Sequence, residues 1–203
     1  MATISETEGL ASGRQSGEAS VSGWVPSNPA PLGLAGFGIT TLALSMINAN
    51  IVGGGAETIV LGLAFAFGGL AQLLAGMWEF RTGNTFGAVA FTSYGAFWIS
   101  FFLLVQFDAK GLTPAGLGLY LWVWGIFTGL LFLCTFASPR ALQLLFLLLT
   151  ITFILLGIGN AGGTTSMVHA GGYFGIATAL VALYIFTADV MKAVYGRAVL
   201  PVG

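Results

Sequence analysis

The amino-acid sequence predicts an all-α membrane protein with six transmembrane helices. Of its 203 residues, 57% are hydrophobic and only 6% are charged, whereas about a quarter of the residues of a soluble domain carry a charge. From Leu32 onward, apolar residues form blocks of about 19 to 23 residues, the length that an α-helix needs to cross ~30 Å of hydrocarbon. These blocks lack the alternating pattern of a membrane β-strand.

The first three spans are predicted at Leu32–Ile51, Thr58–Glu79 and Phe86–Gln106. Pro29 and Pro31 fix φ at values that suit the start of the first helix. A connection with three glycines separates the first span from the second, and residues 81–85 separate the second from the third. No broken helix is evident in the middle of any span.

The last three spans are predicted at Ala115–Ala137, Ala141–Gly159 and Ala170–Met191. The connections before them, residues 107–114, 138–140 and 160–169, are all short. His169 is the only histidine, and we expect it in the last of these loops rather than in a proton relay. Connections this short leave room for only one compact membrane domain, residues 28–203.

Residues 1–27 are predicted to form a flexible cytoplasmic tail. They are rich in Ser, Gly and Glu and contain no apolar stretch, so they cannot bury enough surface to offset the entropy lost on ordering. The segment also lacks the basic start and apolar core of a signal peptide.

The positions of the basic residues predict the orientation of the chain in the cell membrane. Lys and Arg in short loops stay on the cytoplasmic side. The basic residues on the side of the amino terminus are Arg14, Arg81, Arg140, Lys192 and Arg197. Only Lys110 falls on the opposite side. Both termini are therefore expected to be cytoplasmic.

Several function classes are excluded by residues that the sequence lacks. A net charge of −1 leaves no basic surface for nucleic acid. One cysteine and one histidine cannot form a metal cluster. A serine intramembrane protease needs a Gly-x-Ser-Gly setting, which is missing, and an aspartyl protease needs two aspartates within the spans, where only Asp189 is available. We expect neither an enzyme nor a cofactor, which leaves transport or channel activity.

Polar residues within the spans recur at helical spacing and mark candidate pore faces. The stripes are Phe37, Thr41, Leu44 and Asn48 on the first span, Gly68, Gln72, Gly76 and Glu79 on the second, and Leu149, Thr152, Leu156 and Asn160 on the fifth. Polar groups are costly in lipid, so each stripe should face a pore or a neighbouring helix. Both interpretations remain open for any single residue.

Two acidic residues lie near the cytoplasmic ends of their spans and are candidates for binding protons. They are Glu79 and Asp189. The alternative is a solvated or ion-paired end, because Arg81 and Lys192 are near them in the sequence.

The triplet Asn28-Pro29-Ala30 is typical of water channels, which carry two copies. This sequence has one copy, at a membrane edge, and no arginine within any span to guard a filter. An aquaporin-like channel for small neutral solutes is therefore the weaker alternative, beside a structural membrane protein without transport activity.

Four motifs give the sequence a more specific likeness. They are Asn28-Pro29-Ala30-Pro31-Leu32-Gly33-Leu34, Gly83-Asn84-Thr85-Phe86-Gly87, Ala90-Phe91-Thr92-Ser93-Tyr94-Gly95 and Gly157-Ile158-Gly159-Asn160. With them the chain resembles the acetate uptake transporter family over residues 28–201. The resemblance implies six spans per protomer, a homo-hexamer, and a path in each protomer for small carboxylates such as acetate or succinate.

The resemblance also implies a constriction of the path at Phe37, Tyr94 and Leu149. These residues lie five, eight and eight positions past the predicted inner boundaries of spans one, three and five. At ~1.5 Å per residue they share a depth of roughly 8 to 12 Å. Three side chains at one level can narrow a pore.

Polar side chains along this path are expected to replace the water around the carboxylate. The candidates are Asn28, Thr40, Thr41, Gln72, Asn84, Ser93 and Asn160. If a proton accompanies the substrate, Glu79 or Asp189 is expected to accept it. The residues do not distinguish a channel from a proton-coupled permease.

Overall fold

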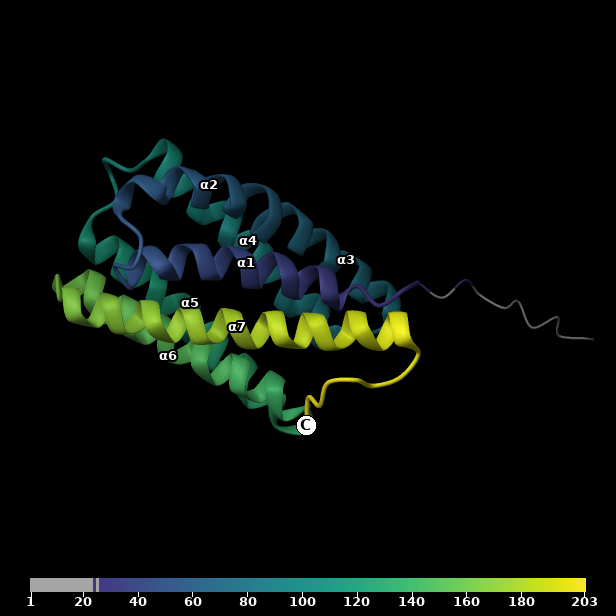
Figure 1. Ribbon diagram of the computed structural model, residues 1–203. Helices are drawn as coiled ribbons and strands as arrows, with labels where there is room; N and C mark the ends of the chain where they lie inside the picture. The colour runs from purple at the N-terminus through teal and green to yellow at the C-terminus, as the bar shows by residue number, and fades with distance from the viewer. Residues whose placement is uncertain (1–23, 25) are drawn as a thin grey trace, which may run out of the picture.

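The computed structural model of this protein describes Trp24 and residues 26–203. The predicted tail therefore lies almost wholly outside the described residues, as does Arg14. Figure 1 shows the described part as a bundle of long helices. In order along the chain, these are α1 (Ala30–Asn48), η1 (Gly54–Ala56), α2 (Glu57–Phe65), η2 (Ala66–Ala71), α3 (Gln72–Thr82), α4 (Thr85–Phe107), α5 (Pro114–Cys134), η3 (Thr135–Ala137), α6 (Arg140–Gly162) and α7 (Thr165–Tyr195).

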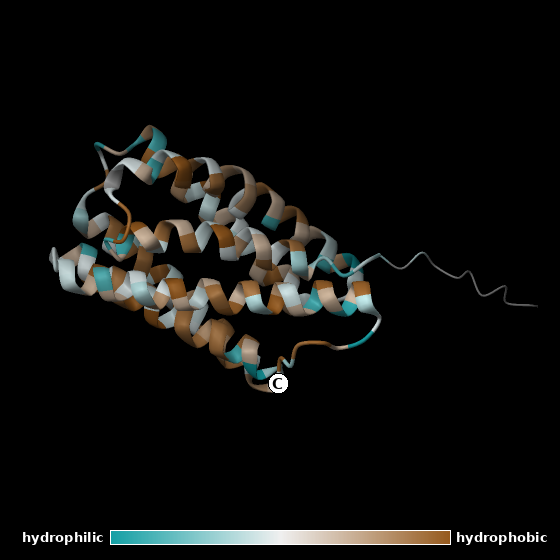
Figure 2. Ribbon diagram, viewed as in Figure 1, coloured by the Kyte–Doolittle hydropathy of each residue, from teal (hydrophilic) through white to brown (hydrophobic). Residues whose placement is uncertain are grey.

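The six predicted spans are confirmed over the described residues. Six helical stretches are long and apolar enough to cross a membrane, with α2, η2 and α3 joined into one 26-residue span. Apolar side chains cover the bundle along its length, while the hydrophilic residues gather mainly at its two ends (Figure 2). A surface of this kind is stable only in lipid, so the protein is a multi-pass membrane protein.

The last span begins earlier than predicted. The turn after α6 contains Gly163, whose φ of 64° reverses the chain within a few residues. The amide of Met167 then donates to the carbonyl of Thr164, so that α7 starts at Thr165. His169 consequently lies in this helix, and its predicted position in a loop was wrong.

The second span contains a π-helix that the sequence did not predict. In η2 each turn holds an additional residue, which widens the helix without breaking it. Gly69 lies there with its α-carbon close to the carbonyl of Ala64, and a β-carbon would come within 2.5 Å of that oxygen. On α1, Gly36 lies against the carbonyl of Phe67 in the same way, at 2.6 Å for a β-carbon. Glycine is therefore required at position 36, where α1 meets η2, and at position 69, within the turn that joins α2 to η2.

The helices pack around a common interior. α1 packs on α7, α7 on α6 and α6 on α5, while α3 packs on α4 and η2 joins α1 to α4. Between α4 and α5 the contact is made by large aromatic side chains, with ring centroids of Phe97 and Trp124 5.2 Å apart and those of Phe97 and Tyr120 5.6 Å apart. Bulky rings hold these two helices apart and leave space inside the bundle.

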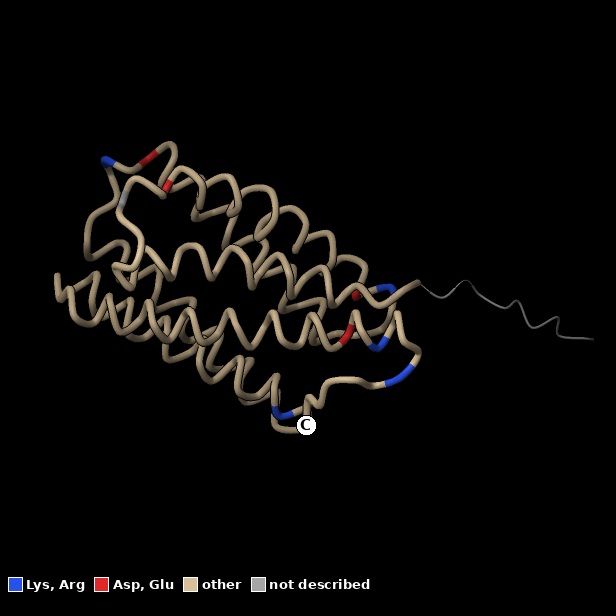
Figure 3. Tube along the Cα trace, viewed as in Figure 1, with Lys and Arg blue, Asp and Glu red and all other residues tan. Residues whose placement is uncertain are grey.

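Charged residues mark the two ends of the bundle (Figure 3). The start of α1, the ends of α3 and α7 and the start of α6 lie at one end, which we call the terminus end. Arg81 at the end of α3, Arg140 at the start of α6 and Lys192 and Arg197 at and after the end of α7 belong to the terminus end, whereas Lys110 follows α4 at the other end, as the sequence predicted.

Candidate functional site

Two cavities lie inside the bundle. The terminus-side cavity has a volume of about 200 Å³ and is lined by residues of α1, α3, α4, α6 and α7, including Gln72, Asn84 and Asp189. The opposite-side cavity has a volume of about 280 Å³ and is lined by residues of α1, α4, α5 and α6, including Thr41, Trp98 and Asn160.

Phe37, Tyr94 and Leu149 line both cavities. All three side chains are buried, and they come from α1, α4 and α6. They lie seven, nine and nine positions beyond the first residues of these helices, which is roughly 10 to 14 Å along the axes. The residues that the resemblance assigned to a constriction thus lie where the two cavities meet.

Hydrogen bonds and ring contacts hold Tyr94 in place. Its phenol donates to Oγ1 of Thr128 on α5 over 2.9 Å, and that hydroxyl in turn donates to the carbonyl of Trp124 over 2.7 Å. The ring of Tyr94 lies 5.7 Å from that of Phe37 and 6.2 Å from that of Phe146. Because both its hydroxyl and its ring are held, Tyr94 is a rigid side chain at the place where it lines both cavities.

Gln72 is the principal polar side chain of the terminus-side cavity. It is the first residue of α3, directly after the π-helix, and only 1% of its side chain is exposed. Its Oε1 atom has no hydrogen-bond partner among the described residues. Asn84 lies nearer the cavity mouth and caps α4 by accepting from the amide of Gly87 over 3.0 Å.

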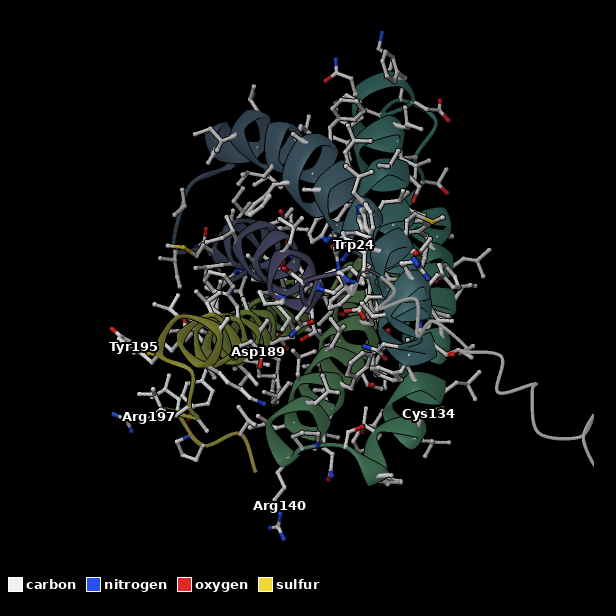
Figure 4. All side chains as sticks on the ribbon, turned by 90° about the vertical axis from the view of Figure 1, so that its right-hand side faces the viewer. Trp24, Cys134, Arg140, Asp189, Tyr195 and Arg197 are labelled. Atoms are coloured by element: carbon white, nitrogen blue, oxygen red, sulfur yellow. The ribbon has the colours of Figure 1, made fainter. Side chains whose placement is uncertain are left out.

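A second group of polar residues forms a groove at the terminus end, beside the terminus-side cavity. Glu79 is 1% exposed, accepts from Oγ1 of Thr82 over 3.1 Å through Oε2, and has no partner for Oε1. Asn28 lines this groove and caps the amide of Ala30 over 3.0 Å. Figure 4 looks at this end, where Asp189 lies toward the interior while Arg140 and Arg197 point outward.

Two of the predicted stripes form much of the opposite-side cavity. Every residue of the predicted stripes on α1 and α6 lines this cavity. These residues are Phe37, Thr41, Leu44, Asn48, Leu149, Thr152, Leu156 and Asn160. The residues of each stripe thus lie on one face of their helix, as their spacing requires. On the second span, Gly68, Gln72, Gly76 and Glu79 are all buried, which also agrees with the prediction.

Comparison with known proteins places this geometry among membrane transporters. The profile of the GPR1/FUN34/yaaH family matches residues 14–202. The succinate-acetate/proton symporter SatP of Escherichia coli K12 is 41% identical over 181 residues, covering 87% of this chain and 95% of the symporter. Acetate permease A of Emericella nidulans is 41% identical over 195 residues, covering 87% of this chain and 65% of the permease.

The chain belongs to the GPR1/FUN34/yaaH family. A solved structure, that of the bacterial acetate channel SatP, superposes on it with a TM-score of 0.83 at 41% sequence identity, covering 88% of this chain and 99% of the channel. The predicted resemblance to acetate uptake transporters and the predicted all-helical fold are confirmed.

Within this family fold, two of the predicted path residues, Thr40 and Ser93, line neither the two cavities nor the groove at the terminus end. Thr40 is fully buried and fills the space at Gly68, where a β-carbon would meet its side chain at 2.7 to 2.9 Å. Ser93 precedes Tyr94 on α4 and faces a different side of that helix. Of the two consecutive pairs Thr40–Thr41 and Ser93–Tyr94, only Thr41 and Tyr94 reach a cavity wall.

Trp98 is a wall residue that sequence reasoning missed. It lies four positions after Tyr94 on α4 and therefore on the same face. Its indole is 2% exposed, and its Nε1 has no hydrogen-bond partner within the part of the chain that the structure describes. The four-residue spacing from Tyr94 was the signal that was available, but aromatic residues are so frequent in this sequence that the spacing alone did not stand out.

The walls of both cavities are mostly apolar. Among the residues that the structure describes, neither cavity is lined by Lys, Arg or His. An anion inside the bundle would thus meet dipoles and hydroxyl or amide donors rather than a fixed positive charge. Such a lining binds weakly and releases readily.

Proposed function

We propose that this protein transports small carboxylates, acetate foremost and also succinate, across the cell membrane through a path inside each protomer. The observation that carries the proposal is that two cavities meet at the same three side chains, Phe37, Tyr94 and Leu149. The relatives named as a succinate-acetate/proton symporter, an acetate permease and an acetate channel support acetate as the substrate.

In this mechanism the carboxylate loses its water in steps. Asn28 lies in the groove at the terminus end, and Asn84 and Gln72 follow in the terminus-side cavity. Beyond the constriction, Thr41 and Asn160 line the opposite-side cavity. Each polar group replaces part of the hydration shell, while the rings and the leucine at the narrow point contact the methyl group of acetate.

Charge movement distinguishes two forms of this mechanism. Because no basic side chain among the described wall residues neutralises the carboxylate, a moving anion has only dipoles to stabilise it. Alternatively a proton travels with the substrate, and two carboxylates at the terminus end are the groups that accept it: that of Glu79, which is buried, and that of Asp189, which is partly buried and lines the terminus-side cavity. The first form responds to voltage, whereas the second responds to the pH gradient.

The protomer is proposed to assemble as a homo-hexamer with cytoplasmic termini. The resemblance to acetate uptake transporters supplies the number six, and the basic residues at the terminus end supply the orientation. Both cavities lie within one chain, so each protomer holds a complete path.

Uptake of labelled acetate into liposomes that contain the purified protein tests the function. Potassium with valinomycin sets the voltage, and an imposed pH difference is varied independently. Flux that follows the pH difference beyond the flux into empty liposomes indicates proton coupling, and flux that follows voltage alone indicates an anion channel. No flux above that of empty liposomes would overturn the proposal in favour of a structural membrane protein.

A matched pair of variants ties the flux to the proposed path. Leu149→Phe enlarges a side chain where the cavities meet, whereas Leu147→Phe makes the same change on the exposed face of the same helix. We expect the first to reduce acetate uptake severalfold and the second to leave it unchanged. Equal uptake by both variants would show that Leu149 does not line the transport path.

A further inference from the structure

The residues after α7 turn back and run along the bundle to the start of α6 (Figure 1). α7 ends at Tyr195, and Gly196 then turns the chain with a φ of 67°, a conformation that glycine adopts readily. Gly203 lies so close to α6 that a β-carbon on it would come within 2.7 Å of the β-carbon of Arg140. Residues 197–203, which we call the strap, therefore bridge the end of α7 and the start of α6.

Two hydrogen bonds hold the strap on these helices. The hydroxyl of Tyr184 donates to the carbonyl of Pro201 over 2.6 Å, and the amide of Ala141 donates to the carbonyl of Val202 over 2.9 Å. The second bond satisfies an amide that α6 leaves free, because its N-cap residue, Pro139, has no side chain that caps the helix. Tyr184 lies eleven residues before the end of α7, so the strap reaches back along the bundle by roughly 16 Å.

The strap is an irregular segment at the edge of the membrane-spanning region. Its five consecutive apolar residues, 198–202, suit this depth, and the two bonds satisfy two of its backbone carbonyls, as a chain without helical bonds requires near lipid. Only Leu200 and Val202 of the strap are partly buried, and its other residues are exposed. A segment held by so few contacts opens locally at a small fraction of the cost of unfolding the bundle.

The side chain of Val202 brings the strap to the terminus-side cavity. Val202 lines this cavity together with Pro139, Ala141 and Leu142 at the start of α6 and Asp189 near the end of α7. The two helices that the strap bridges thus both border the cavity, and the strap closes the wall between them. If the strap lifted, Val202 would leave the wall and the cavity would open between α6 and α7.

We propose that the strap is a gate for the terminus-side cavity, with Gly196 as its hinge and the bonds from Tyr184 and Ala141 as its latch. In the closed form Val202 narrows the entrance, and in the open form a carboxylate enters between α6 and α7. Because both latch bonds are formed in the structure, the open form is the minor one. The inference rests on the proposed transport function and deepens it, because it names the step that controls entry from the terminus end.

Tyr184→Phe tests the latch, because it removes only the hydroxyl that donates to Pro201. At acetate concentrations below half-saturation we expect uptake into liposomes to rise roughly fivefold, the effect of one neutral hydrogen bond on a two-state equilibrium with a minor open form. Tyr195→Phe is the matched control, since it removes an exposed hydroxyl of the same helix that lines neither cavity nor the groove. It should transport like wild type. Equal uptake by Tyr184→Phe and wild type would overturn the gate.

A reversible cross-link separates a moving gate from a fixed wall. In the Cys134→Ser background, Tyr184→Cys and Pro201→Cys place two thiols where the latch bond lies. Joining them with a short bis-methanethiosulfonate should lower acetate uptake toward that of empty liposomes, and dithiothreitol should restore it. Methyl methanethiosulfonate, which modifies both thiols without joining them, is the control and should not lower uptake. Uptake that the cross-link leaves unchanged would show that the strap is a fixed part of the wall.

Hydrogen exchange at the amide of Ala141 reports the latch without any substrate. In Tyr184→Phe this amide should exchange severalfold faster than in wild type and in Tyr195→Phe, because opening of the strap exposes it to water. If wild type takes up no acetate, the proposed function fails whatever the exchange rates are. If wild type transports acetate but the amide exchanges equally fast in both tyrosine variants, only the gate fails.

Discussion

At the scale of single residues, Tyr94 connects more of the site than any other side chain described above. Its ring lies within 6.2 Å of the rings of Phe37, Trp124, Phe127 and Phe146, and its hydroxyl is bonded to Thr128. In the proposed path the ring would set the width, while the hydroxyl holds the ring through its bond to Thr128. These two contributions can be separated by substitution.

Tyr94→Ala should widen the path and raise the flux of succinate relative to acetate, because the largest ring at the narrow point is removed. Tyr94→Phe keeps the ring, loses only the bond to Thr128, and should retain the selectivity of wild type at a cost of about 1 kcal/mol in stability. Uptake across a series from acetate to succinate measures the selectivity. Unchanged selectivity in Tyr94→Ala would show that the path narrows elsewhere.

Gln72→Ala should lower acetate flux while assembly stays normal, because it removes the buried amide of the terminus-side cavity. Thr92→Val is the control, since it removes a buried hydroxyl that lines neither cavity. Uptake in liposomes and size-exclusion chromatography measure the two properties. Full flux in Gln72→Ala would reduce Gln72 to a packing role.

Sequence reasoning found the site residues unevenly, for physical reasons. Phe37 and Tyr94 lie within motifs with flanking glycines, so their positions followed from the resemblance. Helical spacing placed Thr41 and Gln72 on the faces that line the cavities. Spacing left Thr40 off the stripe of the first span, yet its hydroxyl made it a candidate for the path; its packing against Gly68 depends on a contact between helices that the sequence does not reveal.

At the scale of elements, the π-helix η2 determines how the second span meets α1. An additional residue per turn shifts the register of everything that follows, and Gln72 is the next residue after it. The backbone of η2 also approaches Gly36 of α1 closely. The position of Gln72 at the cavity thus depends on a contact between two backbones.

Gly36→Ala should destabilise the protein and lower acetate flux, because its β-carbon would lie 2.6 Å from the carbonyl oxygen of Phe67 and backbone cannot move aside. We expect a loss of about 1 to 3 kcal/mol in stability. Gly129→Ala is the control, since its β-carbon meets only a methyl group of Thr150 at 3.7 Å. Thermal unfolding in detergent compares the two, and equal melting temperatures would contradict the role of Gly36.

The elements were predicted to different degrees. The thickness of the bilayer sets the length of a span, so each of the six apolar blocks of that length could be predicted to form one helix. The π-helix depends on contacts of η2 with α1 and α4 that are distant in sequence. The start of α7 depends on the turn at Gly163. The residues that follow this glycine have the composition of a loop, so the sequence did not reveal that the helix already begins there.

At the scale of the whole molecule, the terminus end is held together by contacts between distant parts of the chain. The amide of Ala141 at the start of α6 donates to the carbonyl of Val202 over 2.9 Å, and the hydroxyl of Tyr184 donates to the carbonyl of Pro201 over 2.6 Å. Val202 also lines the terminus-side cavity. The segment after α7 is thus part of the wall on the side where the basic residues gather.

The uneven charge of the two ends predicts which end faces the cytoplasm. The sequence contains a single cysteine, so Cys134→Ser supplies a background without thiols. In that background, Ala137→Cys places a thiol at the terminus end, in exposed η3, and Lys110→Cys places one at the opposite end. A maleimide that does not cross membranes should label intact cells at position 110, and should label position 137 only after permeabilisation.

The physical reason is the cost of moving four basic side chains across the bilayer, against one in the other orientation. Normal acetate uptake by both cysteine variants serves as the control for correct folding. If intact cells were labelled at position 137 and not at position 110, the termini would be external. The groove that holds Glu79 and Asn28 would then face the outside, and any proton that Glu79 accepts would enter the path from there.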